Sequence, residues 1–529
     1  MFMATAALAS SAARPVVVGL TGSIGMGKST ASRYFAAAGF RVHDADAVVH
    51  SLYAAGGAAV GPVCAAFPGV EAAGGGNDRS KLSAAVATAG RDASLKTLES
   101  IVHPLVSADR DAFVARAAAE GEWLIVLDIP LLMETMDGAT RSTLLDALVV
   151  VSAPADVQRE RVLSRPGMTS DKLDFILTKQ VADADKRAAA DYVIETGHES
   201  FAPARAQLAR CLADLSTRHA ARYATWRDQP VSSPKDVTPC KVARVRGVSF
   251  DLDDTLFPTM PPIMAASQTL ATAIEREMPN SFAAGAAERS ALRGSMKAVS
   301  EEQPLLAHDF TELRRVSLQK LARAHGDKPS DVDRVVDTFV RARSNVRQHF
   351  YPEVPEALKA VRAAGLPVGS LTNGNCNVRA HEEVSEWFDF AITAADCGAS
   401  KPHPVPFWIA AAAATHAQPQ ARARAQGAPQ VPPAKRAHDE TEAEQTLKPR
   451  HLVHIGDDVS TDLLGALAAG CRAVLISRPE LAPRPPEQTA LLPAADPSRW
   501  REVGTVDEAI KVVMDWRSDG EEAAKVDVS

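Results

Sequence analysis

The stretch Gly22–Ser29 has the residue types and spacing of a phosphate-binding loop. It fits the pattern G-x-x-x-x-G-K-[ST] and directly follows the apolar run Val16–Leu20. Backbone N–H groups of such a loop, at the start of a helix, surround phosphate oxygens. Lys28 can reach the β- and γ-phosphates, and the Ser29 hydroxyl can hold Mg²⁺. The alternative is a glycine-rich turn, which the preceding strand and the helix-compatible residues after it disfavour. The predicted nucleotide-binding residues are Gly22, Ser23, Ile24, Gly25, Met26, Gly27, Lys28, Ser29 and Thr30.

Acidic residues in the same half could complete a site for phosphoryl transfer. Asp44 and Asp46 follow the expected second strand, at the carboxyl edge of a sheet, where ligands bind. A carboxylate there can accept a hydroxyl proton and orient the attacking oxygen, or it can be an ordinary loop acid or helix N-cap. Asp128 closes a buried apolar run, a position from which a carboxylate supports Mg²⁺ or its water. The loop alone does not distinguish a kinase from a GTPase or an ATPase.

Basic residues follow on a later helical stretch. Arg161 and Arg165 lie close to Gly167, and Lys179, Lys186 and Arg187 come after them. They are either solvated helix charges or part of a mobile lid whose guanidinium groups neutralise developing phosphate charge.

A second, unrelated set of candidate catalytic residues begins at Asp251. Asp251, Asp253 and Thr255 alternate directly after an apolar strand. A carboxylate nucleophile at Asp251 can attack phosphorus and form an aspartyl-phosphate. Asp253 can protonate the leaving alcohol and then activate water.

Three further elements follow Asp251 in order, each after a strand-like run. Thr372 supplies a hydroxyl for a phosphate, and Lys401 supplies a cation. The predicted Mg²⁺ ligands of this half are the acids Asp251, Asp253, Asp457, Asp458 and Asp462. Carboxylates so close together repel one another unless Mg²⁺ and a lysine neutralise them. Any single acid could be a solvated loop residue, but the ordered set predicts a phosphate-processing site.

Length and composition indicate a globular protein with several domains. The 529 residues exceed one ordinary core, and 46% of them are hydrophobic and 23% charged. The formal net charge of −7, without a long basic run, does not argue for nucleic acid or membrane as a partner. The sequence contains no apolar run of about 18 residues, the length that would predict a membrane span.

Six scattered cysteines favour reduced thiols and a cytoplasmic protein. The first 14 residues suggest a disordered leader, with a transit-peptide remnant as the alternative.

Both halves alternate strand-like and helical stretches, which predicts α/β domains with parallel sheets. The strands expected in the first half are Val16–Leu20, Phe40–Val42, Trp123–Ile129, Ala147–Ser152 and Asp191–Glu195. Those expected in the second half are Gly247–Phe250, Leu366–Leu371, Phe390–Thr393, Leu452–Ile455 and Ala473–Ile476. Between them lies a helical block with an apolar stripe that is typical of packing, formed by Val332, Val335, Val336, Phe339 and Val340.

The first half resembles dephospho-CoA kinase. The matching stretches occur in the family's order and are Gly19–Ser29, Asp44–Asp46, Asn77–Leu82, Leu98–Pro104, Asp128–Leu132 and Ala190–Ile194. The resemblance implies ATP-dependent phosphorylation of the ribose 3′-hydroxyl of dephospho-CoA, with Asp46 as the base. It further implies that Arg79 and His103 seat the acceptor and that Arg161 and Arg165 are lid arginines. The stretch Glu195–Gly197 stands where the family usually has an Asn before the last helix, a departure expected to affect nucleotide or lid contacts, and KM more than the reaction.

The second half resembles the haloacid dehalogenase superfamily of phosphatases, and within it the bacterial flavin-nucleotide phosphatase group. The shared stretches are Phe250–Leu256, Leu371–Asn375, Ser400–Pro402 and His454–Asp458 with Thr461 and Asp462. The resemblance implies Mg²⁺-dependent hydrolysis of a small phosphomonoester, and flavin mononucleotide is a candidate. The helical block is the inserted cap of that superfamily. One alternative is a module that binds or regulates without turnover; another is a phosphatase for a coenzyme A pathway metabolite such as 4′-phosphopantetheine.

These observations together predict two Rossmann-like cores in one chain. The predicted parts are a leader at residues 1–14, a P-loop kinase domain at 15–222 with a helical acceptor and lid region, a linker at 223–245, a capped phosphatase domain at 246–516 and a loose tail at 517–529. Within the phosphatase domain, the cap is expected at about 258–350 and a disordered insertion at about 416–449.

Overall fold

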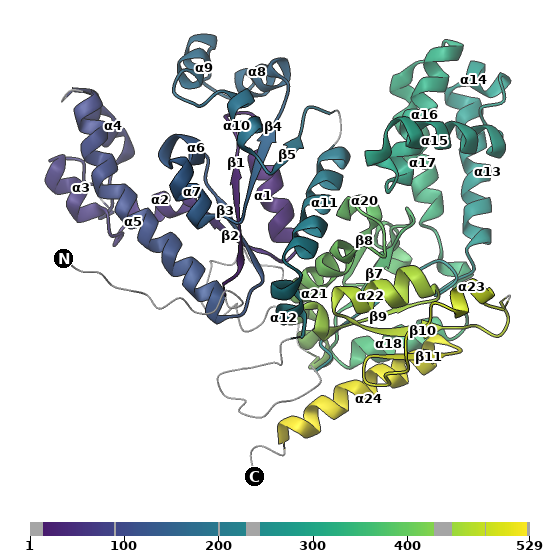
Figure 1. Cartoon of the computed structure of the whole chain (residues 1–529). Coiled ribbons are helices and arrows are strands. Elements are labelled where there is room, and N and C mark those ends of the chain that lie inside the picture. Colours follow the sequence, from purple (N-terminus) through teal and green to yellow (C-terminus); the bar gives the residue numbers. More distant parts are fainter. Residues whose placement is uncertain are drawn as a thin grey trace. The chain divides into compact units, whose positions relative to one another are not determined.

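The computed structural model of the chain describes residues 14–72, 74–88, 91–198, 201–228, 244–427, 447–481 and 483–525. They form two compact units, and Figure 1 shows the course of the chain. Unit 1 holds the described residues of 14–36, 40–198 and 219–226, and unit 2 holds the others. Nearly all of the predicted leader, most of the predicted linker and residues 428–446 of the predicted insertion lie outside the described residues.

Unit 1 is built on a five-stranded parallel sheet with the order β2-β3-β1-β4-β5. Its strands are β1 (Val16–Thr21), β2 (Arg41–Asp44), β3 (Leu124–Asp128), β4 (Ala147–Ser152) and β5 (Tyr192–Glu195). The three central strands consist mainly of Val, Leu and Ile and are buried along their whole length, as expected of parallel strands covered on both faces. All five strands lie where the sequence predicts them, so the prediction of a parallel α/β fold is confirmed for this half.

Helices connect and cover the strands of unit 1. They are α1 (Lys28–Ala37), α2 (Ala45–Tyr53), α3 (Val60–Ala66), α4 (Arg79–Thr88), α5 (Arg91–Ala119), α6 (Leu132–Thr135), α7 (Gly138–Leu144), α8 (Ala155–Leu163), α9 (Ser170–Leu177), α10 (Asp183–Ala189) and α12 (Ala220–Asp228). Helices α3 to α5 share a small core of their own that includes Val63, Phe67 and Leu82. This separate helical group is the predicted helical region beside the sheet.

Unit 2 is built on a six-stranded parallel sheet with the order β11-β10-β9-β6-β7-β8. Its strands are β6 (Gly247–Phe250), β7 (Val368–Thr372), β8 (Phe390–Thr393), β9 (Leu452–Gly456), β10 (Arg472–Ile476) and β11 (Trp500–Val503). The sequence predicts the first five. It does not predict the edge strand β11, because Arg501 and Glu502 interrupt its apolar residues and the strand is only partly buried.

The helices of unit 2 fall into a cap and a layer around the sheet. The cap helices, between β6 and β7, are α13 (Met260–Glu277), α14 (Pro279–Ala283), α15 (Arg289–Glu302), α16 (Phe310–His325) and α17 (Val332–Arg343). The predicted apolar stripe of α17 packs in the cap's own core with Ala266 and Leu270 of α13. The other helices are α11 (Ala202–Arg218), α18 (Val354–Ala363), α19 (Glu382–Ser385), α20 (Ala394–Cys397), α21 (Pro404–Ala425), α22 (Gly465–Ala469), α23 (Pro486–Thr489) and α24 (Val506–Lys525).

Helices extend into three segments for which the sequence predicts disorder. Helix α21 runs to Ala425, so the expected disorder is wrong for residues 416–425, where Ala417 and Ala421 are buried. Helix α24 runs to Lys525 through the predicted loose tail, because Glu, Ala and Lys residues sustain a helix. Helix α12 continues to Asp228, inside the predicted linker.

Helix α11 belongs to unit 2, whereas the predicted kinase domain extends through it to residue 222. The physical reason is its apolar content: Ala202 joins Val299, Leu306 and Leu313 of the cap region in one buried cluster. Residues 219–226, which include α12 residues Tyr223 and Trp226, return to unit 1.

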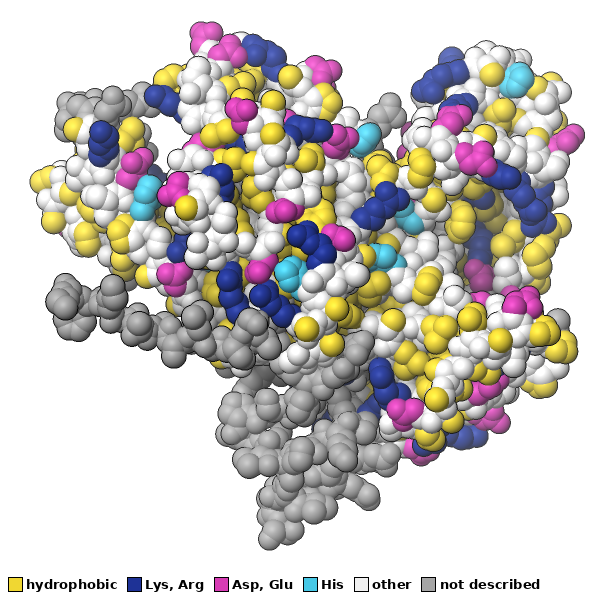
Figure 2. Space-filling view, in the orientation of Figure 1, with side chains coloured by type: hydrophobic (Ala, Val, Ile, Leu, Met, Phe, Trp, Pro, Cys, Tyr) yellow, Lys and Arg dark blue, Asp and Glu magenta, His cyan; other side chains and the backbone are white. Residues whose placement is uncertain are grey.

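On the face drawn in Figure 2, Lys and Arg side chains are interspersed with Asp and Glu. Among the described residues, no helix combines the length and apolar content that crossing a membrane requires.

Candidate active sites

The glycine-rich loop of unit 1 links the end of β1 to the start of α1. Gly25 and Gly27 have φ angles of +81° and +88°, a region that residues with a Cβ rarely adopt. Helix α1 begins at Lys28, so the loop's N–H groups stand at a helix N-terminus. This is the strand–loop–helix arrangement that the sequence predicts.

Lys28 and Asp128 form an ion pair at the carboxyl edge of the sheet of unit 1. Asp128 ends β3 and is buried, and burial raises its pKa although Lys28 pulls in the opposite direction. Ser29, the predicted Mg²⁺ ligand next to Lys28, is exposed. The predicted lysine, hydroxyl and carboxylate are therefore neighbours at one end of two adjacent strands.

Asp44 and Asp46 differ in what they do structurally. Asp44 is the N-cap of α2 and accepts a hydrogen bond from the N–H of Ala47 at 3.0 Å. It also stands opposite Asp128 in the β2–β3 register. Asp46 lies in the first turn of α2 and is exposed. The N-cap interpretation thus applies to Asp44, and Asp46 stays accessible beside the sheet edge.

Three side chains that sequence reasoning did not assign to the loop hold its backbone. Gln158 donates to the carbonyl of Ile24 at 2.8 Å, and Gln180 accepts from the Ile24 N–H at 3.2 Å. The Thr196 hydroxyl donates to the carbonyl of Met26 at 2.7 Å. Because these residues follow the loop by more than 130 positions, no local pattern reveals the contacts.

Lys186 also contacts the loop, through the side chain of Ser23. Its ammonium group is fully buried, donates to the Ser23 hydroxyl at 3.1 Å and pairs with Glu134 at 2.9 Å. The interpretation of Lys186 as a solvated helix charge is therefore wrong. It neutralises a buried carboxylate directly behind the loop.

The predicted lid and acceptor residues lie on several helices of unit 1. Arg161, on α8, donates to the Thr196 hydroxyl at 3.1 Å and also to its carbonyl oxygen. Arg165 follows α8 and is exposed. Arg79 begins α4 and His103 lies within α5, and both side chains are exposed. The structure thus brings Arg161 to the loop through Thr196, while the other three stay on exposed surfaces.

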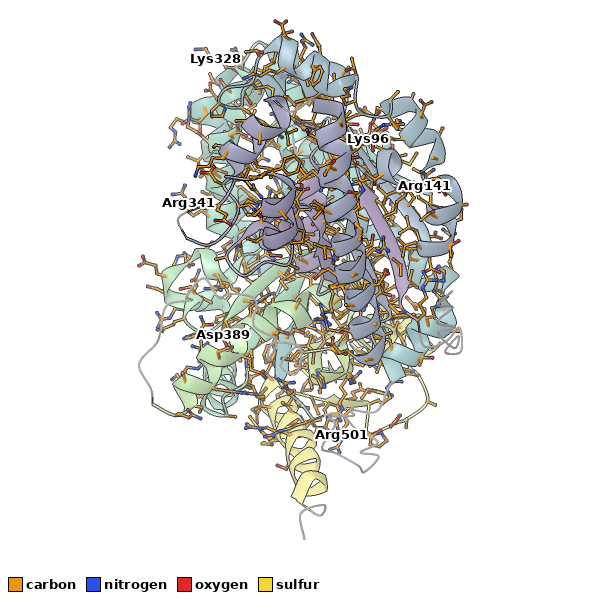
Figure 3. The ribbon with its side chains drawn as sticks, turned by 90° about the vertical axis from the view of Figure 1, so that its left-hand side faces the viewer. Lys96, Arg141, Lys328, Arg341, Asp389 and Arg501 are labelled. Atoms are coloured by element: carbon orange, nitrogen blue, oxygen red, sulfur yellow. The ribbon has the colours of Figure 1, made fainter. Side chains whose placement is uncertain are left out.

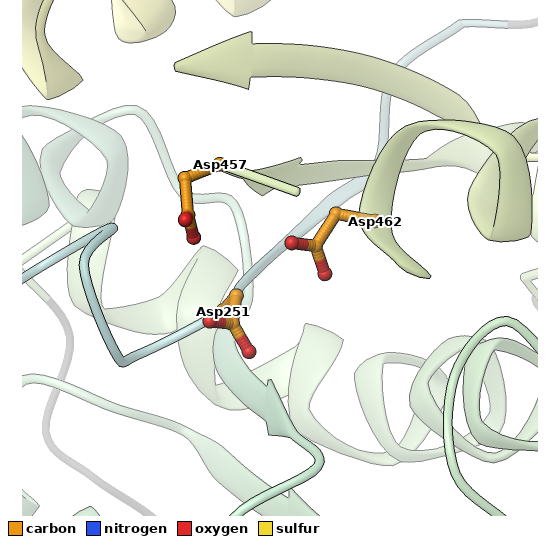
Figure 4. Close-up of side chains that lie close together, drawn as sticks. All are labelled: Asp251, Asp457 and Asp462. Atoms are coloured by element: carbon orange, nitrogen blue, oxygen red, sulfur yellow. The ribbon is translucent and has the colours of Figure 1, made fainter. Parts of the chain in front are cut away.

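The predicted nucleophile of unit 2, Asp251, follows β6 and is buried against Lys401. The Lys401 ammonium donates to Asp251 Oδ1 at 2.7 Å and also to Asp462. Carboxylate oxygens of Asp251, Asp457 and Asp462 all lie within 4.8 Å of one another, and Figure 4 shows the three side chains converging. Three residues separated by up to 211 positions thus meet at the carboxyl edge of one sheet.

This cluster perturbs the pKa of every member. Burial raises the pKa of Asp251 well above its usual range, although Lys401 opposes the rise. Burial, together with the negative charge of Asp462, raises the pKa of Asp457 to about 7. Burial also disfavours ionised Asp462, but Lys401 and His454 outweigh it and hold that pKa below its ordinary value. Burial disfavours the charged form of Lys401, but the Asp251 and Asp462 carboxylates outweigh this effect and raise its pKa.

The remaining predicted catalytic residues surround this cluster. The Thr372 hydroxyl, at the end of β7, accepts from the Gly374 N–H at 2.9 Å. Asn373 fixes the Lys401 backbone from both sides, because it donates to the Lys401 carbonyl at 3.0 Å and accepts from the Lys401 N–H at 2.7 Å. The loop that carries Thr372 and the backbone of Lys401 are therefore fixed to each other.

Two predicted metal ligands are engaged elsewhere. Both carboxylate oxygens of Asp253 accept from Nη2 of Arg343, at 2.5 and 2.7 Å. Asp458 accepts from the Thr461 N–H at 2.7 Å and from Gln488 at 2.9 Å. The structure does not bring these two acids into the group of Asp251, Asp457 and Asp462, because Arg343 and a helix cap hold them.

His454 is a member of the site that sequence reasoning missed. Its Nε2 lies 3.1 Å from Asp462 Oδ1, and its Nδ1 lies 3.0 Å from the Ser249 hydroxyl. Burial lowers the pKa of His454, which favours a neutral ring that donates to Asp462. His454 lies inside strand β9, where its sequence position resembles that of any core residue.

The three converging carboxylates fit a hard divalent cation. Mg²⁺ prefers oxygen ligands and is bound by one or two carboxylates with waters and substrate phosphates. Asp462 already accepts from Lys401, His454 and the Asp458 N–H, so its lone pairs are largely used. Asp457 accepts from Thr255 at 2.8 Å through Oδ1 alone. Asp251 and Asp457 are therefore the best-suited ligands of the three.

Comparison with known proteins gives a family for each half. A family model described as dephospho-CoA kinase matches residues 16–200, and one described as haloacid dehalogenase-like hydrolase matches residues 245–470. A dephospho-CoA kinase of Mesorhizobium japonicum is 54% identical over 200 residues, 38% of this chain and 96% of that protein. One of Brucella melitensis is 48% identical over 206 residues, 39% of this chain and 98% of that protein.

Solved structures also match each half. A 2-haloacid dehalogenase from Pseudomonas syringae is 25% identical, with a TM-score of 0.39, over 51% of this chain and 99% of that chain. A dephospho-CoA kinase from Campylobacter jejuni is 20% identical, with a TM-score of 0.29, over 38% of this chain and 97% of that chain.

Proposed function

Because the chain belongs to the dephospho-CoA kinase family through residues 16–200 and carries a haloacid dehalogenase-like hydrolase domain at residues 245–470, we propose that it is a bifunctional enzyme. The first activity transfers the γ-phosphoryl group of ATP to the 3′-hydroxyl of dephospho-CoA. The second hydrolyses a small phosphomonoester. We further propose a cytoplasmic location, which the reduced state of the described cysteines supports.

The ion pair of Lys28 with Asp128 beside the glycine-rich loop carries the kinase proposal. Loop N–H groups and Lys28 bind the phosphates. Ser29 and Asp128 would hold Mg²⁺, which would neutralise charge on the transferring group. Asp46 accepts the proton of the attacking hydroxyl, whose oxygen forms the new bond to phosphorus as the bond to ADP breaks. Arg79 and His103 are proposed to seat the acceptor, and Arg161 and Arg165 to neutralise the phosphates.

The buried contact between Lys401 and Asp251 carries the phosphatase proposal. An Asp251 oxygen attacks phosphorus and the ester bond breaks, while Asp253 gives a proton to the leaving alcohol. Water then attacks the aspartyl-phosphate as Asp253 takes up a proton, which releases phosphate and restores Asp251. Lys401 and Thr372 bind the phosphoryl oxygens, and a Mg²⁺ held by Asp251 and Asp457 offsets the negative charges.

The kinase is tested by replacing Lys28. We expect Lys28→Ala to abolish ADP release from ATP and dephospho-CoA while phosphate release by the second half continues. Asp251→Asn is the reciprocal control, since it should remove phosphate release and leave ADP release unchanged. A Lys28→Ala protein that still makes coenzyme A would overturn the kinase assignment.

The phosphatase is tested with a panel of phosphomonoesters and Mg²⁺. Flavin mononucleotide, 4′-phosphopantetheine and sugar phosphates form the panel, and Lys28→Ala protein removes any contribution from the kinase. Turnover that disappears in Asp251→Asn supports the proposal. The second candidate, a silent regulatory module, is favoured if no phosphomonoester is hydrolysed; retention of Asp251, Asp253, Thr372, Lys401 and Asp457 argues against it.

A further inference from the structure

Arg343 brings a cation from the cap into the proposed phosphatase site. It ends α17, its side chain is only 3% exposed, and its Nη2 donates to both oxygens of Asp253. In the part of the chain that the structure describes, the second terminal nitrogen, Nη1, is buried and has no hydrogen-bond partner. A buried donor without an acceptor costs free energy, so this nitrogen is poised for an acceptor that a ligand supplies.

Arg314, on the neighbouring cap helix α16, is a second guanidinium group with unused donors. Its Cζ lies 3.7 Å from the centre of the Phe339 ring, and its Nε is buried without a hydrogen-bond partner. The hydrogen bond that it donates within the described residues is a long contact of 3.4 Å to the carbonyl of Phe310. Among the described residues no carboxylate pairs with it, and burial alone lowers its pKa to about 10. An unpaired, partly buried cation is unfavourable unless something compensates for it.

Helical spacing relates both arginines to residues that contact the catalytic site. Thr311 lies one turn before Arg314 on α16 and accepts from Asn375 of the loop that carries Thr372, at 3.4 Å. Phe339, which stacks on Arg314, lies one turn before Arg343 on α17. One turn of helix is about 6 Å for four residues, so the two arginines stand in succession along one face of the cap.

The phosphoryl group itself does not need these arginines. Lys401 and Thr372 already provide it with a cation and a hydroxyl, and the converging carboxylates provide a metal site. The two guanidinium groups come from the cap, on the side of Asp253, which in the proposed reaction protonates the leaving alcohol. Their unused donors are therefore available to bind the alcohol portion of the substrate.

We propose that Arg314 and Arg343 form an anion subsite, so that the preferred phosphomonoester carries a second anionic group, a carboxylate or a second phosphate, on its alcohol portion. This inference rests on the proposed phosphatase function. Guanidinium groups bind both kinds of anion with paired, charge-assisted hydrogen bonds. By this criterion flavin mononucleotide, with a single phosphate, is a weaker substrate than a doubly anionic one.

The test uses the full-length protein and three related three-carbon phosphomonoesters. Glycerol 1-phosphate has an uncharged alcohol portion, 3-phosphoglycerate adds a carboxylate, and glycerol 1,3-bisphosphate adds a phosphate. We expect kcat/KM to be at least about tenfold higher for one of the two doubly anionic esters than for glycerol 1-phosphate. The doubly anionic ester with the higher kcat/KM identifies the second group as carboxylate or phosphate.

Arg314→Met should lower that preference to about threefold or less, mainly through a higher KM for the doubly anionic ester. The matched control is Arg341→Met on the same cap helix as Arg343; Arg341 is exposed and is labelled in Figure 3. The control should keep the full preference. Calorimetric binding of the same three esters to Asp251→Asn protein measures the preference without turnover.

The outcomes separate this inference from the proposed function. Asp251-dependent hydrolysis of all three esters at equal kcat/KM would overturn the anion subsite and leave the phosphatase intact. A preference that survives Arg314→Met overturns it as well. If none of the esters is hydrolysed, the binding measurement decides: equal affinities overturn the subsite, and tighter binding of a doubly anionic ester supports a binding module with this specificity.

Discussion

The hydroxyl of Thr196 lies 2.7 Å from the carbonyl oxygen of Met26, so the end of β5 holds the middle of the glycine-rich loop. Arg161 donates to the same hydroxyl at 3.1 Å, and the three residues form a short chain of hydrogen bonds. The Thr196 hydroxyl therefore supports the loop that is proposed to bind ATP.

Replacing this hydroxyl by a methyl group should weaken ATP binding. We expect Thr196→Val to raise the KM for ATP about fivefold, because a buried hydrogen bond contributes about 1 kcal/mol, while kcat changes little. Thr143→Val is the control, since the Thr143 hydroxyl makes a similar bond to the Ala139 carbonyl on the exposed helix α7. Steady-state kinetics at saturating acceptor measures both. An unchanged KM in Thr196→Val would show that the loop holds its shape without β5.

Local sequence patterns predicted most of the framework of both sites. The buried parallel strands are mostly apolar, and residues suited to catalysis lie at their ends or in the loop after them. Lys28, Asp128 and Asp251 could therefore be placed at sheet edges. The same reasoning fails for β11, in which charged residues separate the apolar ones. It also fails for the disorder predicted from residue 416, because alanine-rich helices carry few large apolar residues.

Contacts between distant residues could not be predicted in this way. Arg343 reaches Asp253 across 90 positions, and Lys186 reaches Ser23 across 163. In the sequence both are charged residues on helices, which are usually solvated. His454 shows the opposite problem, since a histidine within a strand resembles a core residue until Asp462 is seen beside it.

The raised pKa of Asp457 makes the metal-free protein less stable as pH rises toward neutral. The ordinary pKa is 3.8 and the folded value is about 7, so the folded state holds the proton more tightly than the unfolded state. Stability is therefore lost as pH rises from about 4 to about 7. At pH 8 in EDTA, we expect Asp457→Asn to unfold at a temperature at least about 2 °C above that of the unchanged protein, the shift for roughly 1 kcal/mol in a unit of this size.

Addition of Mg²⁺ should reverse this difference, so that the unchanged protein unfolds at a higher temperature than Asp457→Asn. The cation offsets the charge of Asp457 in the unchanged protein and raises its unfolding temperature, whereas Asp457→Asn lacks one ligand and should respond weakly. Differential scanning calorimetry with and without Mg²⁺ measures all four conditions. Equal responses of the two proteins to Mg²⁺ would mean that Asp457 does not bind the metal.

His403 should contribute to loss of stability in acid. Burial lowers its pKa from 6.5 to about 4, so the folded state favours the neutral ring. This contribution is complete above pH 6.5 and is lost as pH falls toward 4. His403 also caps α21 by accepting from the Val405 N–H at 3.3 Å, a bond that Asn can replace.

We therefore expect His403→Asn to lose less stability than the unchanged protein between pH 7 and pH 5, by about 1–2 kcal/mol. Urea unfolding of unit 2 at the two pH values measures the difference. His325→Asn, at an exposed position of the same unit, is the control and should follow the unchanged protein. Parallel pH curves for all three proteins would contradict the assigned role of His403.

Gly398 tests whether α11 is an integral part of unit 2. It ends α20 with a φ of +72°, and a Cβ at this position would lie 2.3 Å from the carbonyl carbon of Arg205 in α11. Gly326 ends α16 with a similar φ of +81°, but nothing lies within 4 Å of its Cβ position. Both Gly→Ala substitutions carry the cost of a left-handed residue, about 1–2 kcal/mol, so the difference between them isolates the clash with α11.

We expect Gly398→Ala to be the more destabilising by at least about 2 kcal/mol in urea unfolding of unit 2, because the α11 backbone cannot yield as a flexible side chain would. Equal losses of stability would mean that α11 moves away at little cost, and that unit 2 does not depend on a helix that precedes its first strand by about 30 residues.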